Sequence, residues 1–141
     1  MEYKFYGWDS PDIKPIETKY NKIKNHKDLY DILSNIWCEY TCAPRMRDIW
    51  SETNKTCGQC SITAFLFQDI FGGEVYGVKL SDGNFHCYNV VDGNQYDLTS
   101  EQFSEKLIYD NIYKQSRDVH FSSKEKYERY KYLSGELEKY L

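Results

Sequence analysis

The stretch TNKTCGQCSITAFLFQDIFGG, from Thr53 to Gly73, is the most apolar segment of the chain and opens with two cysteines three residues apart. From Cys60 onward its apolar residues recur at helical spacing and make a wide stripe, formed by Ile62, Phe65, Leu66, Ile70 and Phe71. The glycine pair Gly72 and Gly73 then supplies the left-handed stop typical of a helix end. We therefore predict a central helix that begins at Cys60.

Three runs rich in β-branched and aromatic residues follow the central helix: EVYGVKL (74–80), NFHCYNVV (84–91) and QYDL (95–98). The turn signals SDG and DGN separate these runs. Short strands joined by tight turns pair with their sequence neighbours, so the pattern predicts an antiparallel meander.

The segments before the central helix differ in regularity. Residues 1–24 contain one glycine and two prolines among polar residues, which predicts an irregular N-terminal arm of low order. Apolar residues then recur at helical spacing after a capping candidate, Asn25, so we expect an amphipathic helix over Lys27 to Glu39. Residues 40–57 show no period, and we expect a loop with at most one helical turn.

Two helix starts are expected after the meander. Thr99 and Gln102 have the spacing of a capping box, which predicts a capped helix directly after the third strand. Ser122 and Glu125 have the same spacing and open a terminal helix over residues 122–141, in which Gly135 marks a weak point. The polar residues between these two starts are expected to form a link.

Helices, then a meander, then helices again indicate an α+β domain rather than an alternating α/β one. A chain of 141 residues with 40% hydrophobic residues suits a single domain with one core. Phosphate loops and dinucleotide-binding glycine motifs are absent from the sequence. Tyrosines on the terminal helix can pack internally or against a second chain, so the sequence leaves the oligomeric state open.

Charge and cysteine usage exclude several classes of function. The net charge is −4, and basic residues are interspersed with acidic ones, so we expect no nucleic-acid partner. The N-terminus has no export signal and no apolar run reaches the roughly 20 residues of a membrane span, so we expect a cytoplasmic protein without a membrane partner. Five cysteines are an odd number, and in a reducing compartment we expect all of them to be free thiols.

Three interpretations of the Cys57 and Cys60 pair compete. A thioredoxin-like redox pair needs a buried strand before it, and the preceding residues are polar and irregular. A structural zinc site needs two more ligands, for which Cys38 and Cys42 are the candidates. The third interpretation takes Cys60 alone as a nucleophile, because the first turn of a helix stabilises a thiolate. Its structural alternative is a small buried residue at a helix start.

A cysteine nucleophile needs a base, and the base needs an orienting acceptor. If Asp92 and Gly93 form a two-residue turn, Tyr88 faces Asp97 across the hairpin. Strand alternation puts His86 on the same face as Tyr88, so Asp97 lies diagonally opposite His86 and within side-chain reach. The spacing therefore predicts a pair of His86 and Asp97.

Each member of this pair has a structural alternative. His86 can be a strand residue facing solvent, and Asp97 can be an acid placed near a helix cap. The other histidines are weaker candidates, because His26 lies beside the expected first cap and His120 lies in the polar link without a matching acid. We therefore take Cys60, His86 and Asp97 as the candidate catalytic residues.

A cysteine at the start of a central helix, followed by a histidine and an aspartate on successive antiparallel strands, resembles the papain-like fold in its wide sense, which includes transglutaminase-like proteins. More narrowly, the segments WSETN, GQCSITAFLFQDIFGGEVYGVKL, HCYN and DGNQYDLTSEQF are similar to the YunG-like bacterial proteins. This resemblance covers about Trp50 to Phe103. The papain-like resemblance implies a papain-like core, in which the central helix packs on a small antiparallel meander and helices lie at the N- and C-terminal ends.

The papain-like resemblance also implies an oxyanion donor six residues before the nucleophile. Asn54 stands at that spacing, where the papain pattern has glutamine, and Gln59 is its rival. Three aromatic residues are expected to line the cleft: Trp50, Phe85 and Tyr88.

The sequence thus leads to two functional hypotheses. The first is a cysteine-dependent acyl-transfer enzyme that hydrolyses or transfers an amide, isopeptide or thioester of a peptide or protein substrate, without a metal or an organic cofactor. The second is a non-catalytic module that binds a protein or peptide on the same fold.

Overall fold

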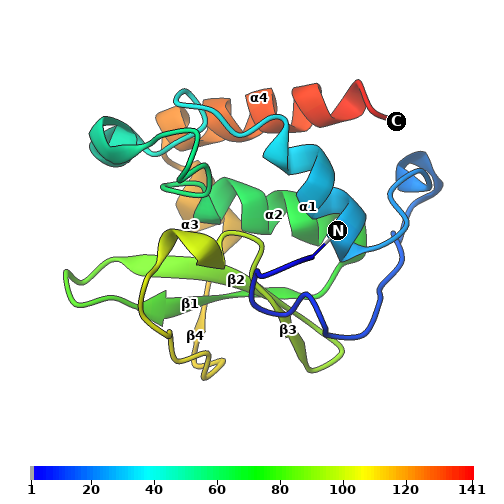
Figure 1. The fold of residues 1–141 in the computed structure, drawn as a ribbon, viewed down its shortest axis with the longest axis horizontal. Coiled ribbons are helices and arrows are strands. Elements are labelled where there is room, and N and C mark those ends of the chain that lie inside the picture. Colours follow the sequence, from blue (N-terminus) through cyan, green and yellow to red (C-terminus); the bar gives the residue numbers. More distant parts are fainter. Residues whose placement is uncertain (1) are drawn as a thin grey trace.

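The computed structural model describes residues 2–141, and its β-strands form one antiparallel sheet with the strand order β3-β2-β1-β4 (Figure 1). The strands are β1 (Glu74–Lys79), β2 (Phe85–Val91), β3 (Asn94–Tyr96) and β4 (Tyr113–Lys114). The first three make the predicted meander, and β4 adds a short edge strand that the sequence pattern did not reveal. The α+β class predicted from the order of the elements is confirmed.

The helices form layers on the sheet. They are α1 (His26–Ser34), α2 (Cys60–Phe71), α3 (Arg117–Phe121) and α4 (Lys124–Glu138). Helix α2 lies directly over the sheet, and α4 crosses α2 on the side away from the sheet (Figure 1). Three 3₁₀ turns connect the larger elements, at Thr18–Tyr20, Pro44–Ile49 and Ser100–Gln102.

The turn between β2 and β3 sets the register of the hairpin. Asp92 and Gly93 have φ angles of 51° and 80°, as a two-residue turn with both central residues at positive φ requires. Val91 pairs with Asn94, as predicted. The same register carried one pair beyond β3 puts Asp97 opposite Tyr88, on the face of the sheet that also carries His86.

Helix α2 begins at Cys60, as predicted, and ends where two glycines take positive φ angles. Gly72 donates its backbone N–H to the carbonyl of Gln68 at 2.8 Å. Gly73 has φ +78°, and a Cβ at this position would lie 2.3 Å from the carbonyl oxygen of Val90. The glycine pair therefore ends the helix and also lets the chain pass close to β2.

The main core lies between α2, α1, α4 and the hairpin. Its fully buried members include Phe5, Leu29, Leu33, Ile62, Leu66, Phe67, Ile70, Tyr96, Leu133 and Leu137. A polar contact supplements this packing, because Asn89 on β2 donates its side-chain amide to the carbonyl of Ala64 at 2.8 Å. This bond fixes α2 against β2, the two elements that carry Cys60 and His86.

The N-terminal arm is irregular, but the expectation of low order was wrong. Phe5, Tyr20 and Ile23 are buried in the main core, so the arm packs as part of the domain. Tyr6 and Asp97 form an isolated antiparallel bridge, with the backbone N–H of Asp97 bonded to the carbonyl of Tyr6 at 2.8 Å. The arm thereby fixes the backbone of the predicted catalytic acid.

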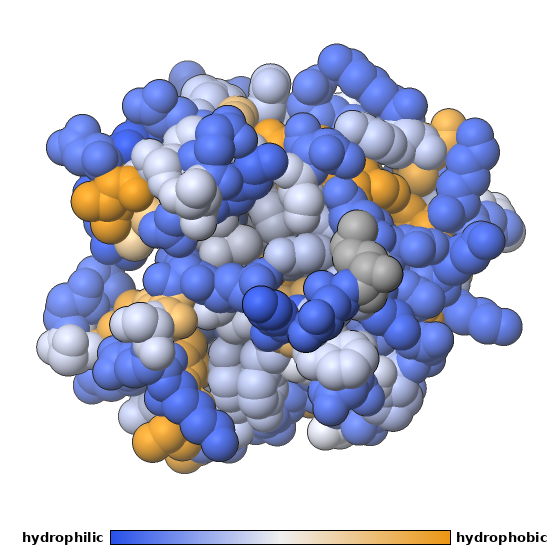
Figure 2. All heavy atoms as spheres, viewed as in Figure 1, coloured by the Kyte–Doolittle hydropathy of each residue, from blue (hydrophilic) through white to orange (hydrophobic). Residues whose placement is uncertain are grey.

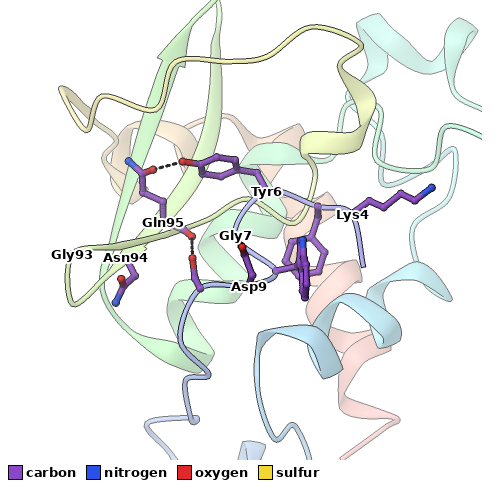
Figure 3. A pocket seen from close by; sticks show the side chains of 10 residues that line it. Lys4, Tyr6, Gly7, Asp9, Gly93, Asn94 and Gln95 are labelled. Atoms are coloured by element: carbon purple, nitrogen blue, oxygen red, sulfur yellow. Dashed lines mark hydrogen bonds between the residues drawn. The ribbon is translucent and has the colours of Figure 1, made fainter. Parts of the chain in front are cut away.

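A shallow pocket of about 490 Å³ lies between this arm and the β2–β3 turn. Figure 3 shows Gln95 reaching the arm from β3, where its side chain accepts a hydrogen bond from the Tyr6 hydroxyl at 2.7 Å. The backbone carbonyl of Gln95 accepts a second bond from the Ser10 hydroxyl at 2.9 Å. Cys60 and His86 lie outside this pocket, which we interpret as a structural seam.

Two helix predictions need correction. The side chain of Asn25 caps α1 as expected, but the helix ends at Ser34 rather than at Glu39. After β3, the predicted capping box does not form, and only a 3₁₀ turn follows. The cause is a competing acceptor, because the hydroxyl and the backbone N–H of Thr99 both bond to the Asp97 carboxylate.

The C-terminal region differs from prediction in two respects. The segment expected to be a polar link contains α3, whose N-cap is Ser116. The terminal helix is capped by Ser123 rather than Ser122, and it continues through Gly135 without a break. A Cβ at Gly135 would meet no atom within 4 Å, so this glycine does not serve close packing.

The surface is polar over most of the face drawn in Figure 2, where apolar side chains appear in small separate groups. Among residues 2–141, no helix has both the length and the apolar character that crossing a membrane requires.

Candidate active site

A pocket of about 680 Å³ opens where α2 begins, and both Cys60 and His86 line it. Its walls come from the 3₁₀ turn at Pro44–Ile49, the β1–β2 turn, the start of β2, and the N-terminal part of α4. The element order that the sequence predicted thus brings the central helix and the second strand to one cavity.

Cys60 is the first residue of α2, with Gln59 as its N-cap residue. The Gln59 side chain makes no capping hydrogen bond. The first-turn amides of a helix have no intrahelical acceptor, and the positive end of the helix dipole lies at the same point. A negative charge on the sulfur, or on an oxygen bound near it, is therefore favoured here.

His86 and Asp97 form a buried pair. The Nε2 atom of His86 lies 2.6 Å from Oδ2 of Asp97, and both side chains are 1% exposed. Because Nε2 is occupied by the carboxylate, Nδ1 is the ring nitrogen left to face Cys60. Phe103 packs edge-on against the imidazole with the ring centroids 4.7 Å apart, which restricts the rotation of the ring.

The Asp97 carboxylate is itself held by several donors. Tyr109 donates its hydroxyl to Oδ2 at 2.7 Å, and the Thr99 backbone N–H donates to Oδ1 at 3.1 Å. Burial and the neighbouring Asp97 charge raise the pKa of Tyr109, so its hydroxyl keeps its proton. These bonds fix the carboxylate in one orientation.

The thiolate form of Cys60 and the imidazolium form of His86 stabilise each other. A hydrogen bond from the Cys87 thiol holds the pKa of Cys60 well below its usual range against the effect of burial, and His86 lowers it further. Burial opposes protonation of His86, but the charge and hydrogen bond of Asp97, together with Cys60, raise its pKa to about 10. The site therefore favours a thiolate and an imidazolium near neutral pH.

Cys87 is a member of the site that the sequence did not reveal. It is buried on the face of β2 that packs on α2, and Cys60 packs against the same apolar cluster. Its hydrogen bond to Cys60 and then its burial raise the pKa of the Cys87 thiol, so Cys87 acts as a donor to Cys60. Alternation along β2 puts Cys87 and His86 on opposite faces, so the sequence pattern gave no signal that both bond to Cys60.

Neither predicted oxyanion side chain lines the pocket. Asn54 lies in a separate pocket of about 180 Å³ together with Trp37 and Glu101. Gln59 is fully buried and donates its side-chain amide to the carbonyl of Cys38 at 3.2 Å. The local reason is a tight turn at Ser51–Asn54 that directs the chain away from the pocket. The backbone N–H of Cys60, in the first turn of α2, is the donor that stays next to the thiol.

The three aromatic residues that were predicted to line the cleft lie in three different places. Phe85 lines the pocket beside His86. Trp50 does not, because its indole N–H donates to the Lys55 carbonyl at 3.0 Å within its own loop. Tyr88 is 1% exposed and bonds through its hydroxyl to Asn111 at 2.7 Å, so it belongs to the interior.

The pocket also contains residues from α3 and α4 that the sequence analysis set aside. His120 lines the wall, with Nε2 2.8 Å from Gln115 Oε1 and Nδ1 2.9 Å from Lys126 Nζ. Burial first, and the Lys126 charge second, lower the pKa of His120 to about 4. The sequence offered no acid partner for this histidine, and its partners are in fact an amide and an ammonium group.

The zinc-site and redox-pair interpretations both require Cys57 and Cys60 to act together, and the structure gives these two cysteines different surroundings. Cys57 packs against Cys42 in the interior, whereas Cys60 contacts Cys87. All five cysteines are free thiols. Over residues 2–141, no three His, Cys, Asp or Glu side chains are arranged as ligands of one metal ion. Cys57 and Cys60 thus contact different thiols.

Comparison with known proteins gives a consistent family match. Residues 25–141 match the model of a family described as YunG protein. Over 102 residues the chain is 33% identical to “Uncharacterized protein YunG” of Bacillus subtilis (strain 168). The aligned residues make up 72% of this chain and 82% of that relative. No solved structure matches the chain.

Proposed function

The chain belongs to the YunG protein family, and we propose that it is a cysteine-dependent acyl-transfer enzyme with a papain-like core. Cys60 is the nucleophile, His86 is the base and then the acid, and Asp97 orients His86. The observation that carries the proposal is the buried 2.6 Å pair of His86 and Asp97, whose histidine lines the same pocket as Cys60.

The burial of this pair favours a catalytic role over a structural one. A histidine and an aspartate that are each 1% exposed lose solvation, and replacing them by apolar residues of similar size is often neutral or stabilising. The histidine of this pair nevertheless lines an open pocket, together with the one cysteine placed at a helix N-terminus. Strongly perturbed groups in a cleft are typical of functional sites.

The proposed reaction begins when the Cys60 thiolate attacks the carbonyl carbon of the substrate, which forms a C–S bond and moves the π electrons to the oxygen. The backbone N–H of Cys60 donates to this oxyanion. His86 gives its Nδ1 proton to the leaving amine or thiolate as the C–N or C–S bond breaks. His86 then takes a proton from water or an acceptor amine, which attacks the thioester and releases Cys60.

The proposed substrate is an amide, isopeptide or thioester of a peptide or protein, because the pocket opens at the surface beside the thiol. Hydrolysis and transfer differ only in whether water or an amine accepts the acyl group. The proposal includes the cytoplasmic location expected from the sequence, where free thiols persist.

Acyl-enzyme formation with p-nitrophenyl acetate tests the proposal. We expect a burst of p-nitrophenol and an acetyl group on the Cys60 peptide in mass spectrometry. Cys60→Ser and His86→Ala should lose the burst, whereas Cys38→Ser, which changes another partly exposed cysteine, should keep it. Acetylation spread evenly over several cysteines, without dependence on His86, would favour the non-catalytic binding module.

A further inference from the structure

The pocket carries a cation whose charge no carboxylate neutralises. Lys126 lies in its wall, and within residues 2–141 no ion pair joins it to Asp or Glu. Arg129, the other cation that α4 contributes to the wall, is 3% exposed and is paired with Glu125. Lys126 therefore differs from its neighbour in keeping its charge available to the pocket.

A chain of hydrogen bonds holds the Lys126 ammonium in place. Gln115 donates its side-chain N–H to the Tyr113 carbonyl at 3.0 Å, so its Oε1 is the end that faces His120. The Nε2 atom of His120 must then donate to Oε1 at 2.8 Å, which leaves Nδ1 as an acceptor for Lys126 at 2.9 Å. A neutral imidazole thus positions the ammonium without cancelling its charge.

The charge of the Lys126 ammonium also reaches the Cys87 thiol. Cys60 and burial raise the pKa of Cys87 and the Lys126 charge opposes that rise, while the charge of Cys60 acts in turn on His120. The Lys126, His120 and Cys60 side chains therefore lie within electrostatic range of one another.

The remaining charges of the pocket define what this cation can bind. Glu125 pairs with Arg129 and also approaches Arg47, while Asp82 bonds to Asn84 and interacts with the charge of Arg45. These two acidic side chains offset the charges of Arg129 and Arg45, so Lys126 leaves the pocket wall with a single positive charge, which a singly charged anion neutralises. A carboxylate fits this field better than a phosphate.

We propose that Lys126 forms a carboxylate-binding subsite beside Cys60 and that the acyl donor carries a carboxylate group close to the reacting carbonyl. This inference rests on the proposed function, since it names the substrate class of the same site. The preferred donors are acidic acyl compounds or peptides rather than neutral or basic ones. Lys126 acts as a specificity residue and takes no part in bond making.

Two alkylating reagents of similar size, one anionic and one neutral, test this subsite. Iodoacetate carries a carboxylate and iodoacetamide is neutral, and both transfer an alkyl group to the thiolate with loss of iodide. The rate constants are measured at the Cys60 peptide by mass spectrometry, at low ionic strength. Their ratio cancels any change in the thiolate fraction of Cys60, because both reagents need the same thiolate.

The variants separate charge from structure. Lys126→Gln retains an N–H donor for His120 but removes the charge, and we expect it to lower the iodoacetate to iodoacetamide ratio about 3- to 10-fold. Lys126→Arg should restore most of the ratio. Lys124→Gln, an exposed position two residues earlier on α4, should leave it unchanged.

The outcomes distinguish the subsite from the proposed function. An accelerated iodoacetamide reaction with a ratio insensitive to Lys126→Gln would overturn the subsite and leave the acyl-transfer proposal standing. An iodoacetamide rate no faster than that of an ordinary thiol would overturn the proposed function itself. Stronger protection of Cys60 by phosphate than by acetate would overturn the assignment to a carboxylate.

Discussion

Replacing Asp97 by Asn is expected to reduce the reactivity of Cys60 through His86. The ordinary pKa of histidine is 6.5, and its displacement to about 10 at His86 corresponds to about 5 kcal/mol in favour of the imidazolium. Asp97 is the largest favourable contributor to this displacement. We assign it about 2–4 kcal/mol, as expected for breaking a pair whose side chains are 1% exposed.

The effect of Asp97→Asn on the alkylation rate of Cys60 is expected to be greatest at mildly acid pH. An ordinary thiol with a pKa near 8.5 is only about 0.3% ionised at about pH 6, so a fully formed thiolate has an advantage of at most about 300-fold. The lower nucleophilicity of a low-pKa thiolate reduces this advantage to about 10- to 50-fold. Without the Asp97 charge, the thiolate–imidazolium pair loses this free energy relative to the neutral thiol–imidazole pair, so the thiolate population and with it the alkylation rate should fall by about tenfold or more.

The assay measures alkylation of Cys60 by iodoacetamide across pH, with circular dichroism as a check on folding. Asp92→Asn is the matched control, because it makes the same substitution on the same hairpin at an exposed turn position outside the pocket. A folded Asp97→Asn protein that alkylates at the wild-type rate near pH 6 would refute the reasoning that Asp97 acts through His86.

Three further substitutions test the fold and the pH dependence of its stability. Gly73→Ala should lower the free energy of unfolding by about 2–4 kcal/mol, because φ is +78° and the new Cβ would lie 2.3 Å from the Val90 carbonyl oxygen. Gly135→Ala should raise it by about 0.5–1 kcal/mol, since a mid-helix alanine there meets open space. Urea denaturation measures both, and equal effects of the two substitutions would contradict the assignment of Gly73. His120→Gln should make stability less sensitive to acid. The folded pKa of about 4 lies below the unfolded value of 6.5, so the wild type loses about 1–2 kcal/mol more than the variant as pH falls through this window. Parallel stability curves from pH 7 to about pH 4 would contradict this.

The sequence predicted the parts of the fold that depend on local pattern. The helix start at Cys60, the three strands and the two-residue turn at Asp92 and Gly93 all follow from periodicity and turn chemistry. Because strand pairing repeats every two residues, the turn also placed Asp97 on the face that carries His86. Local rules were sufficient wherever the interacting residues are close in the sequence.

The errors arise where distant segments decide the structure. Phe5 is buried by residues far along the chain, so the composition of the arm could not reveal its packing. The capping box at Thr99 failed because Asp97 offered a better acceptor two residues earlier. His120 and Lys126 enter the pocket only through the folding of α3 and α4 against it.

The oxyanion prediction failed for a related reason. The spacing of six residues before Cys60 assumes a loop of the papain type, and the tight turn at Ser51–Asn54 gives the chain another path. A spacing in residues sets how far apart two positions lie along the chain, but it does not set the direction that the chain takes between them. Backbone amides at the helix start need no such assumption, because the helix itself positions them.

Titration of the Cys60 thiolate by its ultraviolet absorbance, in the wild type and in His86→Ala, tests the central claim most directly. Cys60 pairs with His86, so the wild type should show one thiolate already formed at mildly acid pH. In His86→Ala the same thiolate should form only at a clearly higher pH, and Cys60→Ser should lack this low-pH step altogether. Identical titration curves for the wild type and His86→Ala would contradict the account, because the thiolate would then owe nothing to the imidazole.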